Sequence, residues 1–298
     1  MIHIERTSVE FEGGTLEVFA SSGEGGGGPV IAAAHPVDLF NEQTVALLVN
    51  ASRARVISVS PRGVGSSSLP VRPGDRTLEG VVEQLEAVRR ALGLERWVFW
   101  GMSGGSMTGQ VYARHHPEAL AGLILSSAGP CFRQTVGDPA CVLSPWFPAW
   151  QAGLAAAGLT GGMAKEEAET EVAAIAEATA WEVVAGVGWV FRRRGGPVLL
   201  VSPVEPSPQM QRMMPALWSF DARGWLGAVR VPTLVMCGTN DPVVPLAYGR
   251  SVHEAIPGSD FLAVEGAGHV PLTDRPTEVA SAVRRFLAER VSSGGYTR

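Results

Sequence analysis

Apolar and polar positions alternate in blocks along most of the chain, with short apolar runs separated by stretches of helical periodicity. Runs rich in Val, Ile, Leu and Phe predict eight strands, at residues 3–12, 15–20, 29–34, 55–60, 97–101, 121–126, 232–237 and 259–264. Most of them are nearly continuous in apolar character, which is typical of a parallel sheet covered on both faces. The first two, joined at Gly13-Gly14, predict an antiparallel hairpin.

Helical periodicity fills the stretches between these runs. It predicts helices at residues 42–52, 77–92, 105–116, 246–256 and 276–291. Thr77 and the Arg275-Pro276 pair lie where helix starts are expected. Strands that alternate with helices indicate the α/β class. We therefore expect a mostly parallel, eight-stranded sheet flanked by helices.

The alternation breaks between about residues 130 and 230. This segment holds an Ala/Glu-rich stretch from Ala152 to Ala185 that predicts helix, a Pro-rich connector at 202–208 and six of the eight tryptophans. A loop of that length is uncommon in a compact domain. We therefore predict an inserted helical cap at residues 131–225, with residues 1–130 and 226–298 forming the core.

The tryptophans of the predicted cap have two interpretations. Packing of the cap against the core accounts for most of them, and one or two are expected to line a substrate pocket. The candidate pocket residues are His35, Met102, Trp146, Trp150, Trp189 and Trp218.

Composition and charge narrow the partners that the chain is expected to have. The net charge is −5, and its 24 Lys and Arg and 29 Asp and Glu residues are scattered without a basic stripe, so we expect no nucleic-acid partner. The charged N-terminus and the lack of any run near ~20 apolar residues predict no signal peptide or membrane span, and hence a cytoplasmic protein. The oligomeric state is left open.

Cysteine and glycine usage bears on cofactors. Three cysteines, Cys131, Cys141 and Cys237, are an odd number, which argues against a secreted disulfide framework, although pairing of the first two stays open. No zinc-type Cys/His spacing is present, and the glycines at 25–28 are not followed by the Lys of a phosphate loop. We expect neither a metal nor a cofactor.

Two serines lie three residues apart in the stretch Trp100-Gly-Met-Ser-Gly-Gly-Ser-Met-Thr-Gly109. Ser103 follows an apolar strand, precedes a predicted helix and has the Gly-x-Ser-x-Gly frame of a nucleophile elbow. Ser106 has Thr108 where the second glycine belongs, and it falls inside the helix. The pattern therefore predicts Ser103 as the nucleophile.

A nucleophilic serine needs a base and an acid that orients the base. Asp241 follows the apolar run at 232–237, and His269 follows the run at 259–264, each in a loop rich in small residues. The order Ser, acid, His and the position after strand ends predict that Ser103, Asp241 and His269 form a catalytic triad. Glu265 is a second candidate acid.

Backbone donors for an oxyanion are expected from two places. One is the amide of Gly104, after the nucleophile, and the other is the loop after the third strand, where Val37 is the expected donor because Pro36 has no N–H. His35 in that loop is interpreted mainly as a buried, hydrogen-bonded residue. In the glycine-rich loop that begins at Ser60, Arg62 is expected to join a structural hydrogen-bond network.

These motifs together resemble the α/β-hydrolase superfamily, and within it the lid-bearing group of proline iminopeptidases and related serine hydrolases. The matching stretches are Ala34-His35-Pro36, residues 61–66, the elbow continuing to Glu118, Val231 to Leu234 with Gly238 to Asp241, and Gly266 to His269. The sequence departs from the usual pattern at Pro36, where the family often has glycine, and at Ser60, where an acid is frequent. The resemblance implies a capped α/β fold with a Ser–His–Asp triad.

The expected function is hydrolysis of an ester, lactone or amide of a small apolar substrate through an acyl-enzyme. C–C bond hydrolysis, a lyase step or acyl transfer by the same triad is an alternative, because one fold hosts many chemistries. An aminopeptidase of the proline iminopeptidase type is another. A ligand-binding protein that performs no catalysis is the most distant.

Overall fold

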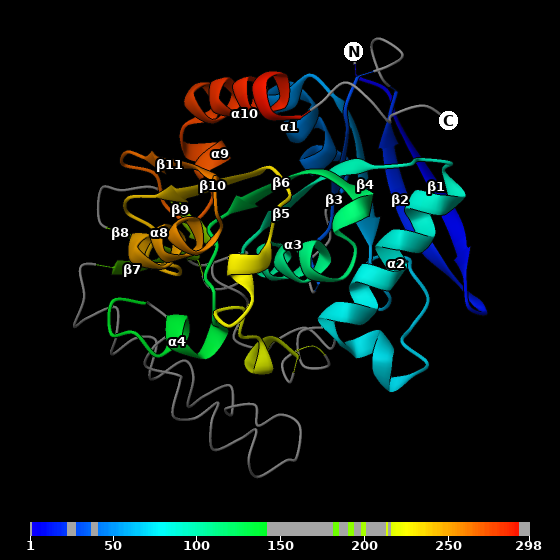
Figure 1. Cartoon of the computed structure of the whole chain (residues 1–298), viewed down its shortest axis with the longest axis horizontal. Coiled ribbons are helices and arrows are strands. Elements are labelled where there is room, and N and C mark those ends of the chain that lie inside the picture. Colours follow the sequence, from blue (N-terminus) through cyan, green and yellow to red (C-terminus); the bar gives the residue numbers. More distant parts are fainter. Residues whose placement is uncertain are drawn as a thin grey trace.

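The central sheet and its flanking helices account for most of the structure that can be described. The computed structural model describes residues 2–22, 28–36, 41–141, 181–184, 190–193, 198–200, 213 and 216–291. An eight-stranded sheet has the strand order β1-β2-β4-β3-β5-β6-β10-β11 (Figure 1). Its strands are β1 (Ile4–Phe11), β2 (Gly14–Ser21), β3 (Val30–Ala33), β4 (Arg55–Ser60), β5 (Trp97–Met102), β6 (Leu120–Ser126), β10 (Thr233–Gly238) and β11 (Asp260–Val264).

Strands β3 to β11 of this sheet pair in parallel, whereas β1 pairs with β2 and β2 pairs with β4 in antiparallel fashion. The strands β3, β6 and β10 are buried along their whole length, as expected for parallel strands covered on both faces. All eight predicted strands are confirmed, and so is the predicted hairpin, whose turn at Glu12 and Gly13 takes positive φ angles.

Helices cover both faces of the sheet (Figure 1). The α-helices described over their full length are α1 (Glu42–Ser52), α2 (Leu78–Ala91), α3 (Gly104–His115), α4 (Phe132–Val136), α8 (Leu246–Ala255), α9 (Pro271–Asp274) and α10 (Pro276–Arg290), and short 3₁₀ turns lie at Pro73–Arg76, Pro117–Ala119 and Leu226–Ala228. One apolar core joins the sheet to α2, α3 and α8, and the other joins it to α1 and α10. The five predicted helices are confirmed.

Local sequence explains where two of these helices begin. The Asn41 side chain accepts hydrogen bonds from the amides of Gln43 and Thr44 at the start of α1, and Thr77 accepts one from Gly80 at the start of α2. Such caps satisfy amides that have no partner within the helix. These starts fix where the loops after β3 and β4 end.

The segment predicted as a helical cap also contains strands. Strands β7 (Trp181–Val184), β8 (Val190–Arg193) and β9 (Val198–Leu200) form a three-stranded antiparallel sheet, described for its backbone. The prediction of helix up to residue 185 is therefore wrong at β7. The physical reason is local composition, because Trp181, Val183 and Val184 favour a pleated strand over the helix that the preceding Ala/Glu-rich stretch suggests. The boundaries predicted for core and cap stay a prediction.

Two further expectations concern cysteines and membranes. Cys131, Cys141 and Cys237 are all buried and none of the three forms a disulfide bond, so the bridge between Cys131 and Cys141 that the sequence left open is not formed. Within the described ranges, no helix combines the length and apolar character that crossing a bilayer requires.

Candidate active site

The candidate residues lie at one edge of the sheet. The strands β5, β6, β10 and β11 are neighbours that run parallel, so their carboxyl ends meet at the same edge. Ser103 follows β5, Asp241 follows β10 and His269 follows β11. Parallel α/β sheets present ligand sites at this edge.

Ser103 connects β5 directly to α3 in a strained conformation. Its φ is 51° and its ψ is −117°, a backbone conformation that residues with a Cβ rarely adopt. Conformations of this kind cost on the order of 1–3 kcal/mol, and the surrounding structure must hold them in place. The turn thereby presents a serine between a strand end and a helix start, as the elbow pattern predicted.

Small residues around Ser103 allow this sharp turn. A Cβ on Gly101 would lie 2.1 Å from the carbonyl oxygen of Gly105, and a Cβ on Gly105 would lie 2.6 Å from the carbonyl oxygen of Ala34. Both contacts are with backbone atoms that cannot move aside easily. The glycines are therefore needed so that strand, elbow and the loop after β3 can approach one another.

Ser106 has a different environment. It lies inside α3, is fully buried, and donates its hydroxyl hydrogen to the carbonyl oxygen of Ser103 at 2.6 Å. This contact helps to fix the elbow and engages the Ser106 hydroxyl within the helix. Ser106 thus lies inside the helix, as the sequence predicted, and the assignment of Ser103 as the nucleophile stays a prediction.

Asp241 and His269 contact each other directly. The Nδ1 atom of His269 lies 3.1 Å from Oδ1 and 3.0 Å from Oδ2 of Asp241, and both side chains are buried. The Oδ1 atom of Asp241 also accepts hydrogen bonds from the amides of Val243 and Val244, each at 2.9 Å. These amides hold the carboxylate in one orientation toward Nδ1 of the imidazole, and Nε2 takes no part in this contact.

The competing groups are placed less favourably. Glu265 is exposed, and its backbone carbonyl accepts a hydrogen bond from Arg275, so Asp241 is the carboxylate that meets His269. Cys237 lies on β10 close to Asp241, but burial raises the pKa of its thiol to about 12, and the charge of Asp241 adds to the shift. A thiol in that state is a poor nucleophile near neutral pH.

Two residues that the sequence did not indicate also hold the histidine loop, which is the loop at residues 265–270 that carries His269. The hydroxyl of Ser127, directly after β6, donates to the carbonyl oxygen of His269 at 2.8 Å. The carboxylate of Asp274 in α9 accepts a hydrogen bond from the amide of Gly268 at 2.7 Å. The doubled serine at 126–127 was visible in the sequence, but nothing there indicated a partner 142 positions away.

The elbow reaches the histidine loop through the end of β6. The amide of Ser103 donates to the carbonyl oxygen of Ser126 at 2.9 Å, and the next residue, Ser127, contacts His269. Between the described residues no hydrogen bond joins the side chains of Ser103 and His269. Catalytic hydrogen bonds are frequently long without substrate and shorten in the reacting complex.

The expected oxyanion site is described in part. Gly104 is the first residue of α3, where amides have no partner within the helix and form the positive end of its dipole. His35 is buried beside it, with Nε2 2.8 Å from the point that a Cβ on Gly104 would occupy. Val37, the second expected donor, lies outside the described residues.

The candidate pocket residues are described for three positions. Met102 is the half-buried last residue of β5, next to Ser103, and His35 packs beside Gly104. Trp218 is half-buried, and its ring packs edge to face against that of Phe132, with the two ring centroids 6.3 Å apart. Trp146, Trp150 and Trp189 lie outside the described residues.

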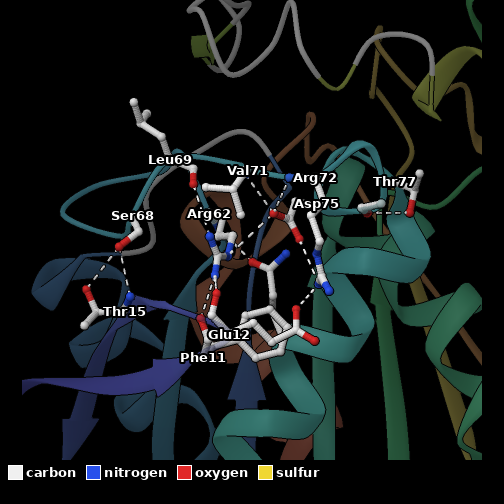
Figure 2. Close-up of polar contacts among 12 residues, drawn as sticks. Phe11, Glu12, Thr15, Arg62, Ser68, Leu69, Val71, Arg72, Asp75 and Thr77 are labelled. Atoms are coloured by element: carbon white, nitrogen blue, oxygen red, sulfur yellow. Dashed lines mark hydrogen bonds and ion pairs between the residues drawn. The ribbon is translucent and has the colours of Figure 1, made fainter.

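The loop after β4 is held by a buried arginine, as predicted (Figure 2). Arg62 is 1% exposed, and its guanidinium donates to the carbonyl oxygens of Phe11, Glu12 and Leu69 at 2.6, 3.0 and 3.2 Å. Its Nε lies 3.8 Å from the buried carboxylate of Asp75, which accepts amide hydrogen bonds from the same loop. All these partners belong to the protein backbone or to a neighbouring carboxylate, so the prediction of a structural network is confirmed.

No group of three or more His, Cys, Asp or Glu side chains is arranged to hold a metal ion in the part of the chain that the structure describes. The chemistry available at the site described above is that of a serine, an imidazole and a carboxylate.

Two family models match parts of this chain. Residues 33–163 match the family described as the alpha/beta hydrolase fold, and residues 212–291 match a family described as TAP-like protein. A proline iminopeptidase of Lactobacillus helveticus is 27% identical over 245 residues, which cover 78% of this chain and 80% of that protein. The chain is thus similar to this peptidase over most of the length of both.

Solved structures give the same fold. An alpha/beta fold family hydrolase from Bacillus anthracis matches with a TM-score of 0.70 and 18% identity, covering 96% of this chain and all of that one. A thermophilic esterase from Thermogutta terrifontis matches with a TM-score of 0.60 and 21% identity, covering 97% of this chain and all of that one. At these identities the likeness shows a shared fold.

Proposed function

We propose that this chain, an α/β-hydrolase that resembles the proline iminopeptidases, is a serine hydrolase that cleaves an ester, lactone or amide of a small apolar substrate. One observation carries the proposal. A strained serine follows β5, and an aspartate–histidine pair held by hydrogen bonds follows the neighbouring strands β10 and β11. That set supplies a nucleophile, a base and an orienting acid at one edge of the sheet.

The first half of the proposed reaction forms an acyl-enzyme. Asp241 accepts the Nδ1–H of His269, so Nε2 takes the proton of Ser103 as its Oγ attacks the substrate carbonyl carbon. The carbonyl oxygen becomes an oxyanion beside the Gly104 amide at the start of α3. Collapse of this intermediate breaks the bond to the leaving alcohol or amine, which takes the proton from His269.

Water completes the cycle. It gives a proton to Nε2 of His269 as its oxygen attacks the acyl carbon, and collapse of the second oxyanion releases the carboxylic acid and returns the proton to Ser103. The Asp241 carboxylate stabilises the imidazolium in both halves. No step requires a group beyond the chain, the substrate and water.

The substrate class is the finer part of the proposal. The tryptophan content of the segment between about 130 and 230 supports an apolar or partly aromatic acyl group. The similarity to a proline iminopeptidase supports amides with an N-terminal proline as a second candidate class. Esters come first, because their alkoxide leaving groups need less assistance than amines.

A substrate panel tests the proposal. Purified protein is assayed with short acyl esters, lactones and N-terminal proline amides, alongside S103A and the matched variant S106A. We expect turnover of at least one class by the wild type and by S106A, and none above background by S103A. Equal turnover by S103A and the wild type would contradict the proposal, and preferred turnover of the proline amides would select the aminopeptidase.

A further inference from the structure

Ser127 is buried in a backbone conformation that disfavours a side chain. Its φ is 51° and it is 1% exposed. Four non-glycine residues have positive φ in the described part of the chain, and the other three are Glu12, Arg53 and Ser103. Glu12 and Arg53 lie exposed in a hairpin turn and at the end of a helix, where such angles are common. The two serines instead follow the neighbouring strands β5 and β6.

The side chain of Ser127 has one specific partner. Its hydroxyl donates to the carbonyl oxygen of His269 at 2.8 Å, and its own amide donates to the carbonyl oxygen of Met236 on β10 at 2.8 Å. Ser127 therefore connects the end of β6 with β10 and with the histidine loop. Glycine would adopt the same φ without strain but would supply no hydroxyl.

The residue before Ser127 contacts the elbow. The carbonyl oxygen of Ser126 accepts the amide hydrogen of Ser103 at 2.9 Å. The dipeptide Ser126-Ser127 thus binds Ser103 through one residue and His269 through the next. Because both contacts are short and largely buried, the dipeptide sets the spacing between the two segments.

We propose that Ser127 is a positioning residue, whose hydroxyl fixes the backbone of His269 at the distance from Ser103 that proton transfer requires. The inference rests on the proposed function, since it concerns the same serine and histidine. Asp241 fixes the orientation of the imidazole through Nδ1, and Ser127 fixes the backbone from which the imidazole extends. Small misplacements of a catalytic group lower the rate strongly, even when substrate binding is unchanged.

Two substitutions separate the hydroxyl from the backbone strain. S127A removes the hydroxyl and keeps a Cβ at positive φ, whereas S127G removes the hydroxyl and relieves the strain. S52A is the matched control, because Ser52 is a buried serine on α1 whose hydroxyl likewise donates to a backbone carbonyl, that of Leu48, at 2.7 Å. The assay measures kcat, KM and Tm with the substrate that the wild type hydrolyses best, and the rate of phosphonylation by a fluorophosphonate.

We expect kcat and the phosphonylation rate of both S127A and S127G to fall about 10- to 100-fold, with KM nearly unchanged. S127G is expected to melt at a higher temperature than S127A, and S52A is expected to lose thermal stability but keep kcat. Wild-type kcat in S127G would overturn the proposal, because strain and not the hydroxyl would then be responsible. Wild-type kcat in both variants, with a loss of Tm like that of S52A, would show a purely structural contact.

Failure of this inference is distinct from failure of the proposed function. If S103A abolishes activity while both Ser127 variants keep it, the serine hydrolase stands and Ser127 is not a positioning residue. If S103A keeps activity, the proposed function fails whatever the Ser127 variants do.

Discussion

Two regions at the same edge of the sheet, the loop after β4 and the turns after β5 and β6, bury polar side chains in different ways. The loop after β4 surrounds Arg62, whose donors bind three backbone carbonyls, and its positive φ angles fall on Gly63 and Gly65. At the ends of β5 and β6 the positive φ angles fall on Ser103 and Ser127. The loop after β4 places glycines, which adopt positive φ without strain, at these positions. The turns after β5 and β6 keep serines there despite the backbone strain.

This difference separates structure from chemistry. The donors of the buried Arg62 guanidinium are taken by protein groups, so this side chain holds the loop in place and has few hydrogen bonds left to offer a substrate. A side chain kept in a disfavoured conformation indicates that the chain needs its functional group there. Substitutions in the two regions are therefore expected to separate a loss of activity from a loss of stability.

The largest effect is expected from the Asp241–His269 pair. H269A removes the base, and its kcat is expected to fall on the order of 10⁶-fold. D241N keeps the shape of the side chain but loses the charge that orients the imidazole, and its kcat is expected to fall on the order of 10⁴-fold. Both values are measured with the ester that the wild type hydrolyses best. A loss of less than about tenfold in H269A would remove the histidine from the mechanism.

The loop after β4 is expected to show the opposite behaviour. R62M removes the hydrogen bonds to Phe11, Glu12 and Leu69 and takes away one of the two cations beside the buried Asp75, the other being Arg72, so the free energy of unfolding is expected to fall by about 3 kcal/mol. Urea unfolding measures this change. The kcat of the folded fraction is expected to stay close to wild type, and a loss like that of D241N would place Arg62 in the chemistry instead.

The smallest effect is a pH dependence of stability at Glu17 on β2. Burial works against ionisation, but hydrogen bonds from the Ser66 amide and from Arg6, together with the charge of Arg6, hold the pKa of Glu17 below its usual value. A lowered folded pKa contributes stability that is present above the unfolded value, about 4.3, and is lost as pH falls through the folded pKa. The difference in Tm between pH 7 and pH 3 is therefore expected to be larger in the wild type than in E17Q. Equal differences would show that Glu17 does not contribute.

The sequence predicted much of this fold because local pattern and final structure agree. The run Trp97 to Met102 is apolar on both faces and became a strand buried on both faces, and the glycines around Ser103 indicated a turn that only small residues permit. Asp241 and His269 were predicted to lie near each other because each follows such a run, and the structure places them in contact. These are local signals.

The features that were missed depend on distant partners or on weak local preference. The role proposed for Ser127 rests on its φ and on a contact with His269, neither of which its neighbours in sequence reveal. Strand β7 follows an Ala/Glu-rich stretch whose composition favours helix, so four residues of strand preference were outweighed. The contact between the Gly268 amide and Asp274 was hidden because Asp274 is the last residue of a short helix that returns its side chain to the loop before it.

Locating the covalent adduct of a fluorophosphonate shows which serine of the chain is an activated nucleophile. The wild type, S103A and S106A are treated with the reagent, digested, and analysed by mass spectrometry for the serine that carries the phosphonyl group. We predict one adduct on Ser103 in the wild type and in S106A, and none in S103A. An unmodified wild type, or an adduct on Ser106 that persists in S103A, would contradict the assignment of Ser103 as an activated nucleophile.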